Sequence, residues 1–297
     1  MTQPQRIGFI GLGMMGLPMT SCLAKAGFQL FLADADPARL RDVQATLNAS
    51  VLTAENANTL DVLITMLPNS AIVESVLLGD GGWAAHLKAG AVVIDMSSSE
   101  PARSRELAHT LKALNLEYLD APVSGGVKRA VDGSLAILVG GDETVMQRCR
   151  SVLEAMGKNI LHIGDAGAGH AAKALNNFVS AAGLMATVEA LHVAKRFGIE
   201  PDVMVDVLNA SSGGTNTSLN KARQFMLSGT FGSGFSMLLM NKDLKIAKGL
   251  SDALDYPLTF GKSAIAVWNE VAQEATPTTD HTEMYRMLAK EGERGGE

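Results

Sequence analysis

Three polar side chains stand close together on a segment that otherwise has the pattern of an apolar helix. Lys173 and Asn177 are four residues apart and would share a helix face, with Asn176 beside them. A lysine and an asparagine in such a place are candidates for lining a polar cleft between two domains. The alternative is a lysine whose stem covers apolar surface while its ammonium group reaches water. A later lysine, Lys242, is by itself typical of a helix surface.

A second group of candidates follows a predicted strand. Ser124, Gly125 and Gly126 offer one hydroxyl and several backbone N–H groups, and a loop of this kind can hold a carboxylate. An ordinary strand-to-helix turn is the other interpretation. The segments 66–69 (MLPN) and 95–98 (DMSS) also follow predicted strands. In a doubly wound sheet, ligands bind at these carboxyl ends.

The first glycines of the chain form the pattern Gly11-x-Gly13-x-x-Gly16, between a predicted strand at Arg6–Ile10 and a predicted helix at Leu17–Ala26. In that context the pattern indicates dinucleotide binding rather than a plain tight turn. Its glycines permit the turn, the approach of a pyrophosphate and close helix–strand packing, and the positive end of the helix faces the phosphates. The predicted cofactor contacts in this turn are Gly11, Leu12, Gly13, Met14, Met15 and Gly16.

The residue at the end of the second predicted strand bears on the choice of cofactor. Asp34 stands there, eighteen residues after Gly16. A carboxylate at this position accepts hydrogen bonds from the ribose hydroxyls of NAD and repels the 2′-phosphate of NADP. The nearest cation, Arg39, falls in the next predicted helix. We therefore expect NAD to be preferred over NADP, unless Asp34 is merely a solvated loop residue.

Strands and helices alternate through the first half of the chain, which predicts a mostly parallel sheet with crossover helices. Helical patterns such as Pro37–Thr46 and Pro101–Leu114 lie between the strands. The predicted strands after the first are Phe28–Asp34, Asp61–Leu67, Ala91–Asp95, Leu116–Asp120, Leu135–Val139 and Ile160–Ile163.

The second half has no convincing strand. One long helical pattern, His170–Gly198, would extend roughly 40 Å. Shorter ones follow at Pro201–Leu208, Asn216–Leu227, Met237–Leu254, Pro257–Glu274 and His281–Lys290. We predict an α/β fold with a Rossmann domain at 1–164, a long interdomain helix, and an all-α domain at 165–297.

Composition excludes several classes of function. The formal net charge is −6, and no basic block is present to bind nucleic acid or an anionic membrane surface. The two cysteines are not arranged with histidines in a metal-binding pattern, so we expect no metal site and no disulfide framework. No signal-peptide pattern and no apolar run of roughly 18 residues are visible. The expected location is the cytoplasm.

Four ordered motifs give the chain a resemblance that covers nearly its whole length. It resembles the β-hydroxyacid dehydrogenases, which include 3-hydroxyisobutyrate dehydrogenase and tartronate semialdehyde reductase. The motifs are GFIGLGMMGLPM at 8–19, DAPVSGG at 120–126, GAGHAAKALNN at 167–177 and NKDL at 241–244. Each alone is weak, but all four in this order are specific.

The resemblance implies roles for individual residues. Lys173 matches the catalytic lysine, and Ser124, Gly125 and Gly126 match the loop that binds the substrate carboxylate. Asn177, with Asn176 beside it, matches an amide that contacts the substrate. The positions that match the cofactor side are Leu67, Pro68, Ser98 and Lys242. The resemblance also implies a homodimer or homotetramer, paired through the helical domains.

The implied reaction interconverts a short 3-hydroxycarboxylate and its semialdehyde, with hydride passing between the hydroxyl-bearing carbon and the nicotinamide. Lys173 would donate a proton in reduction and accept one in oxidation. A free lysine has a pKa near 10.4, so the base role requires burial or a nearby cation to lower it. A charged lysine can also stabilise a developing oxyanion.

Departures from the family pattern leave alternatives open. Arg129 stands where many relatives have a small residue, and 128–130 and 280–282 are closer to reductases of polar semialdehydes, of the tartronate semialdehyde or sulfolactaldehyde type. These cations would meet such a substrate or face water. No role is assigned to Gly229–Phe235. Imine reductases share the architecture but generally lack the lysine, and a non-enzymatic dinucleotide-binding relative is a further alternative.

Overall fold

The computed structural model describes the backbone of residues 5–294 and the side chains of residues 5–289. The chain divides into two compact units, of which the first ends at Lys173 and the second begins at Ala174. The division falls inside one helix, α9 (Ala168–Phe197), so that this helix carries residues of both units. The domain boundary expected at 164/165 stays a sequence-based prediction.

A nine-stranded sheet forms the centre of the first unit, in the order β3-β2-β1-β4-β5-β6-β8-β7, with β9 paired to β8. Pairing is parallel from β3 to β6, whereas β8 runs antiparallel to β6 and β7. The strands are β1 (Arg6–Ile10), β2 (Gln29–Ala33), β3 (Ser50–Val51), β4 (Val62–Thr65), β5 (Val92–Asp95), β6 (Glu117–Asp120), β7 (Val123–Ser124), β8 (Leu135–Gly140) and β9 (Gly157–Gly164). The β3-β2-β1-β4-β5-β6 order is that of a dinucleotide-binding fold, which confirms the predicted α/β class.

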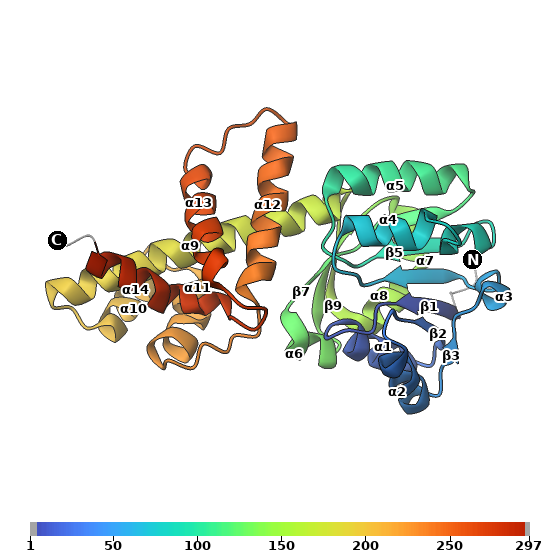
Figure 1. The fold of residues 1–297 in the computed structure, drawn as a ribbon, viewed down its shortest axis with the longest axis horizontal. Helices are drawn as coiled ribbons and strands as arrows, with labels where there is room; N and C mark the ends of the chain where they lie inside the picture. The colour runs from blue at the N-terminus through green and yellow to red at the C-terminus, as the bar shows by residue number, and fades with distance from the viewer. Residues whose placement is uncertain (1–4, 295–297) are drawn as a thin grey trace. The chain divides into compact units, whose positions relative to one another are not determined.

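Helices cover both faces of this sheet (Figure 1). They are α1 (Gly16–Lys25), α2 (Pro37–Leu47), α3 (Ala54–Ala57), α4 (Ser70–Leu78), α5 (Pro101–Ala113), α6 (Gly126–Val131), α7 (Glu143–Arg148) and α8 (Arg150–Met156), with a 3-10 turn η1 at Trp83–His86. Neighbouring residues of one strand point to opposite faces of the sheet. Ile94 packs in the cluster under α1 and α8, and Val93 packs in the cluster under α4 and α5. Burial on both faces explains why the strand sequences are nearly continuous apolar runs.

The second unit is helical, as predicted. Its elements beyond α9 are α10 (Pro201–Ala210), α11 (Asn216–Asn220), a π-helical segment η2 (Ala222–Leu227), α12 (Met237–Ala253), α13 (Gly261–Val271), the 3-10 turns η3 (Ala272–Glu274) and η4 (His281–Glu283), and α14 (Met284–Arg294). Trp268, which is fully buried, lies in its core. Two predicted helices differ from the structure. Asn216–Leu227 is interrupted at Lys221, whose backbone leaves the helical region (φ −129, ψ −38), and the helix expected from Pro257 begins only at Gly261.

By length and composition α9 could cross a membrane, since an 18-residue window has a mean hydropathy of 1.2. Polar residues interrupt this window, so no continuous apolar run is present. Core helices of soluble proteins pass the same test, but only 44% of the window is buried here. The large apolar residues left exposed on this helix are Leu175, Val179, Val193 and Phe197.

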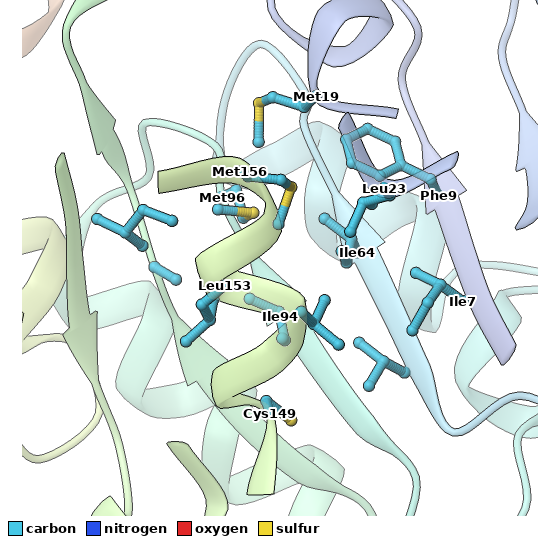
Figure 2. Close-up of a cluster of buried hydrophobic side chains, with 14 of the residues drawn as sticks. Ile7, Phe9, Met19, Leu23, Ile64, Ile94, Met96, Cys149, Leu153 and Met156 are labelled. Atoms are coloured by element: carbon cyan, nitrogen blue, oxygen red, sulfur yellow. The ribbon is translucent and has the colours of Figure 1, made fainter. Parts of the chain in front are cut away.

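The sheet core makes a quantitative prediction about stability. Leu153 is fully buried among Ile94, Cys149 and Met156 (Figure 2). Leu153→Ala should therefore lower the free energy of unfolding by about 2–5 kcal/mol, through lost transfer energy and a residual cavity. Leu114→Ala, at a side chain that is 46% exposed, should change it by less than about 0.5 kcal/mol. Denaturant titration followed by circular dichroism measures both variants, and equal losses would contradict the assignment of this core.

Candidate active site

The glycine-rich turn joins β1 to α1 and is held against the neighbouring strand ends. A Cβ at Gly11, whose φ is +99, would lie 2.3 Å from the Met66 carbonyl oxygen, and one at Gly16 would lie 1.9 Å from the Gly11 carbonyl oxygen. These two glycines are therefore required by the protein's own packing. A Cβ at Gly13 would meet nothing within 4 Å. Gly13 thus leaves open space on the turn, as close approach of a ligand to the backbone would need.

The side chains of the turn differ in where they point. Leu12 is buried in the sheet core, Met15 packs against that core, and Met14 is 75% exposed. Leu12 can therefore meet a cofactor only through its backbone. Helix α1 begins without a side-chain cap at Met15, so no side chain there occupies the first N–H groups. Such a helix start is suited to a phosphate, and the turn fits the predicted dinucleotide.

Asp34 is not a solvated loop residue. Its side chain is 6% exposed, and its oxygens accept hydrogen bonds from the backbone N–H of Leu12 at 2.6 Å and of Asp36 at 2.8 Å. It therefore ties the end of β2 to the glycine-rich turn. The Arg39 guanidinium lies 3.4 Å from one Asp34 oxygen and is itself 45% exposed. A carboxylate and a guanidinium thus lie side by side where the sequence placed only the carboxylate.

The loops after β4 and β5 are fixed to each other by hydrogen bonds at this edge of the sheet. The Leu67 N–H donates to the Ser97 hydroxyl at 2.9 Å. Behind it, the buried Asp95 carboxylate accepts from the Thr65 and Ser99 hydroxyls. The predicted cofactor residues Leu67, Pro68 and Ser98 lie on these two loops, and Pro68 is exposed. The sequence pointed to Ser98, and the structure adds its neighbour Ser97 as a residue that bonds one loop to the other.

The Ser124–Gly126 loop joins β7 to α6 through left-handed backbone. Gly125 has φ +132 and Gly126 has φ +69, conformations that glycine adopts without strain. A Cβ at Gly125 would lie 2.5 Å from Cδ of Arg129, so the stem of that exposed arginine crosses the loop. The arginine that departs from the family pattern therefore touches the candidate carboxylate loop.

Lys173 lies at this same loop. Its side chain is buried, and Nζ donates a hydrogen bond of 2.6 Å to the carbonyl oxygen of Val123, the residue before Ser124. It does not extend along a solvated face, which was the alternative left by its sequence. An amine, a hydroxyl and glycine N–H groups are therefore gathered at one place in the first unit.

Asn177 follows one helical turn after Lys173, in the second unit. Its side-chain Nδ2 donates to a carboxylate oxygen of Asp243 at 2.5 Å, and its Oδ1 accepts from Asn176 at 3.1 Å. Asn177 and Asp243 are both buried. The motif at 241–244 had directed attention to Lys242, which is half-buried on α12, but its neighbour Asp243 fixes the Asn177 amide. Nothing in helical spacing indicates a contact 66 residues away.

The segment 280–282, for which the sequence left two interpretations, contacts the Gly229–Phe235 loop, to which it gave no role. The Asp280 carboxylate accepts from the Ser233 hydroxyl and the Gly234 N–H, which holds the Gly229–Phe235 loop. Asp280 is itself buried, yet its pKa is held well below the usual range because hydrogen bonds from His281 and Thr282 outweigh the desolvation. His281 is buried and does not face water. We interpret this cluster as the anchor of the loop.

Sequence reasoning missed a buried polar network at the start of α9. Asp120, at the end of β6, is fully buried, and His170, on the first turn of α9, is 1% exposed. Burial and the carboxylates of Asp95 and Asp120 raise the pKa of Tyr118, on β6, well above its ordinary value, so this phenol stays neutral. Asp120 and His170 stand inside two of the quoted motifs, but only the fold brings them into contact.

Comparison with known proteins identifies the family. Residues 6–164 match the model described as the NAD binding domain of 6-phosphogluconate dehydrogenase. Residues 167–288 match the model described as NAD-binding of NADP-dependent 3-hydroxyisobutyrate dehydrogenase.

Individual relatives cover nearly the whole chain. A 2-(hydroxymethyl)glutarate dehydrogenase of Eubacterium barkeri is 38% identical over 89% of this chain and 88% of its own length. A 2-hydroxy-3-oxopropionate reductase of Escherichia coli is 36% identical over 95% and 97%. The structure of Mycobacterium tuberculosis 3-hydroxyisobutyrate dehydrogenase with L-serine has a TM-score of 0.89 and 32% identity, over 96% of this chain and 99% of that one. The chain therefore belongs to the 3-hydroxyisobutyrate dehydrogenase family of NAD(P)-dependent β-hydroxyacid oxidoreductases.

Proposed function

We propose that the protein interconverts a short 3-hydroxycarboxylate and its semialdehyde, with NAD as the preferred cofactor and Lys173 as the proton donor and acceptor. The observation that carries the proposal is the placement of the Lys173 amine. It is buried and bonded to the Val123 carbonyl, directly before the Ser124–Gly126 loop. A group that must exchange a proton with a bound substrate needs this combination of fixed position and nearby anchoring loop.

Different residues bind the substrate and exchange the proton. The Ser124 hydroxyl and the N–H groups of Gly125 and Gly126 hold the substrate carboxylate. Bound NAD supplies the hydride acceptor. As the substrate is oxidised, the Lys173 amine takes the proton that leaves the hydroxyl group, and in reduction the ammonium returns it to the forming alkoxide. The Val123 carbonyl directs the amine toward this loop.

Asn177 orients the reacting hydroxyl group in this proposal. An amide nitrogen carries two N–H donors, and one of them is bonded to Asp243. The second donor can meet the substrate oxygen. Because Asp243 and Asn176 fix both ends of the amide, Asn177 presents its donor in one orientation.

Arg129 supports a second candidate substrate class within the same chemistry. Its stem lies against Gly125, so its guanidinium is carried beside the carboxylate loop. A cation there suits a substrate with an additional anionic or hydroxylated group, as in tartronate semialdehyde or sulfolactaldehyde.

Activity with a substrate panel tests the reaction and Lys173 together. The wild type should reduce NAD with at least one of 3-hydroxyisobutyrate, glycerate, L-serine, threonate, 3-hydroxypropionate and 2-(hydroxymethyl)glutarate, followed by NADH absorbance. Lys173→Ala should lower kcat by about 10²- to 10⁴-fold, the contribution typical of a general acid or base. Its affinity for NADH, measured by fluorescence titration, should stay nearly unchanged.

Lys158→Ala, at an exposed lysine on β9, is the matched control and should keep full activity. A fully active Lys173→Ala protein would refute the role of the lysine. A wild type that binds NADH but turns over neither the panel acids nor their semialdehydes would refute the proposed substrate class.

Cofactor preference follows from the pair formed by Asp34 and Arg39. The wild type should show a higher kcat/KM with NAD than with NADP, because the Asp34 carboxylate accepts from ribose hydroxyls and repels a 2′-phosphate. Asp34→Ser should raise the NADP-to-NAD ratio of kcat/KM by about tenfold or more, since it removes the repulsion and the ion pair of Arg39 with Asp34, while the pair with Asp36 remains. Activity with both cofactors should fall, because Leu12 also loses its acceptor.

Asp36→Asn is the control, since Asn can still cap α2 while the nearby charge changes by the same amount. A wild type that prefers NADP would contradict the assignment of NAD.

We further propose that the second unit pairs with another copy to form a homodimer or homotetramer. The support is the exposed apolar face of α9, where Val179 is 67% exposed and Phe197 is 83% exposed. Val179→Glu should lower the assembly mass measured by light scattering. Val131→Glu, at an equally apolar and 55% exposed position of the first unit, should not. A monomeric wild type would contradict the proposal.

A further inference from the structure

The buried network at the start of α9 has no part in the chemistry proposed so far. The Asp120 carboxylate ends β6, and its two oxygens accept one backbone N–H each, from Gly167 at 2.7 Å and from His170 at 2.8 Å. Gly167 directly precedes α9 and His170 lies in its first turn, where N–H groups lack partners within the helix. A fully buried carboxylate is therefore satisfied by the start of the helix that carries Lys173.

The His170 side chain fixes the same helical turn from the other side. Its Nε2 donates to the carbonyl oxygen of Ser97, after β5, at 3.1 Å. Its Nδ1 lies 2.7 Å from the Ser104 hydroxyl on α5. The imidazole thus joins three elements of the first unit. Since the Ser97 hydroxyl also accepts from Leu67, the network connects the start of α9 to the proposed cofactor side.

Three glycines around this network leave no room for a side chain. A Cβ at Gly140 would lie 2.4 Å from an Asp120 carboxylate oxygen, and one at Gly169 would lie 2.3 Å from the Leu138 carbonyl oxygen. A Cβ at Gly167, whose φ is +88, would lie 2.6 Å from the Pro101 carbonyl oxygen. The glycines of the motif at 167–177 therefore allow the helix to begin directly against the strand ends.

We propose that Asp120 and His170 are positioning residues that set where the Lys173 amine lies. Lys173 follows His170 by three residues and shares its helix face. The segment Asp120–Val123 then contacts Lys173 and its helix at two points. Asp120 bonds to the start of the helix, and Val123 bonds to the end of the lysine side chain. The inference rests on the proposed function only where it assigns chemistry to this amine.

The competing explanation is a cap that stabilises the helix and does nothing more. The two explanations differ in what happens to Lys173 in a protein that still folds. A positioning role predicts that the amine moves when one oxygen of Asp120 is lost. A purely stabilising role predicts a lower melting temperature with the amine unchanged.

Asp120→Asn tests the difference, because Asn presents one oxygen and one NH₂ group where two N–H donors need acceptors. The first measurement needs no substrate: trinitrobenzenesulfonate labelling of Lys173, read by peptide mass spectrometry. Labelling should be faster in Asp120→Asn than in the wild type. Asp142→Asn, the same change at a capping aspartate of α7, should leave it unchanged.

The second measurement is a double-mutant cycle on kcat, with NAD and 3-hydroxyisobutyrate or the panel acid that is turned over fastest. Asp120→Asn should lower kcat by about 10- to 100-fold, as expected when a reacting group is displaced by a fraction of an ångström to an ångström. KM for NAD should be little changed. In the Lys173→Ala background the same change should have almost no further effect, because the two residues act as a unit.

Unchanged labelling of Lys173 in folded Asp120→Asn overturns the inference, and so does a full additional loss in the Lys173→Ala background. If Asp120→Asn does not fold, His170→Gln replaces it, since this change keeps the Asp120 bonds and removes only the imidazole contacts. It should also speed labelling, and an unchanged rate overturns the inference. Faster labelling together with a fully active Lys173→Ala protein would leave the positioning role standing and refute the proposed function.

Discussion

A carboxylate with no exposed surface must obtain its hydrogen bonds from the protein around it, because burying it unpaired would be costly. In this protein that carboxylate is Asp120, and its bonds come from the N–H groups of Gly167, directly before α9, and of His170, in the first turn of α9. The N–H groups at the start of the helix likewise need acceptors, because they have no partners within the helix. The start of the long helix is thereby fixed to the end of β6, and the position of Lys173 follows from it.

The parallel sheet brings the remaining groups to the same edge. The glycine-rich turn follows β1, Leu67 follows β4, Ser97 follows β5 and Asp120 ends β6, and these strands are neighbours in the sheet. In such a sheet the carboxyl ends of parallel strands meet along one edge, which is where ligands bind. The first unit thus brings together the glycine-rich turn, the loops proposed to meet the cofactor, and Lys173, although these segments are far apart in sequence.

Sequence predicted the parts of the fold that depend on local pattern. The glycine spacing gave the β1–α1 turn, buried apolar runs gave the central strands, and helical periodicity gave α9 to within a few residues of its bounds. Two-residue strands such as β3 and β7 were missed because they are too short to show a period. The break at Lys221 was missed as well, since no glycine or proline marks it in the sequence.

For the candidate site, too, the sequence pointed to residues with local signals and not to their distant partners. Lys173, Asn177 and the Ser124–Gly126 loop were found from residue type and motif, and the structure adds the partners that hold them. Asp243 fixes Asn177 over 66 residues, and Asp120 meets His170 over 50. Aspartates of this kind carry no local signal, because an acidic residue after a strand or on a helix is ordinary. Their importance comes from burial, which only the packed structure shows.

The proposed oxidoreduction is tested by following the hydride from the cofactor to the substrate. The protein would be incubated with the semialdehyde of its best acid and with NADH carrying deuterium at the transferred C4 position, and the hydroxyacid formed would be examined by mass spectrometry and NMR. Direct hydride transfer places the deuterium on the carbon that bears the new hydroxyl group. A hydroxyacid without deuterium at that carbon would contradict it.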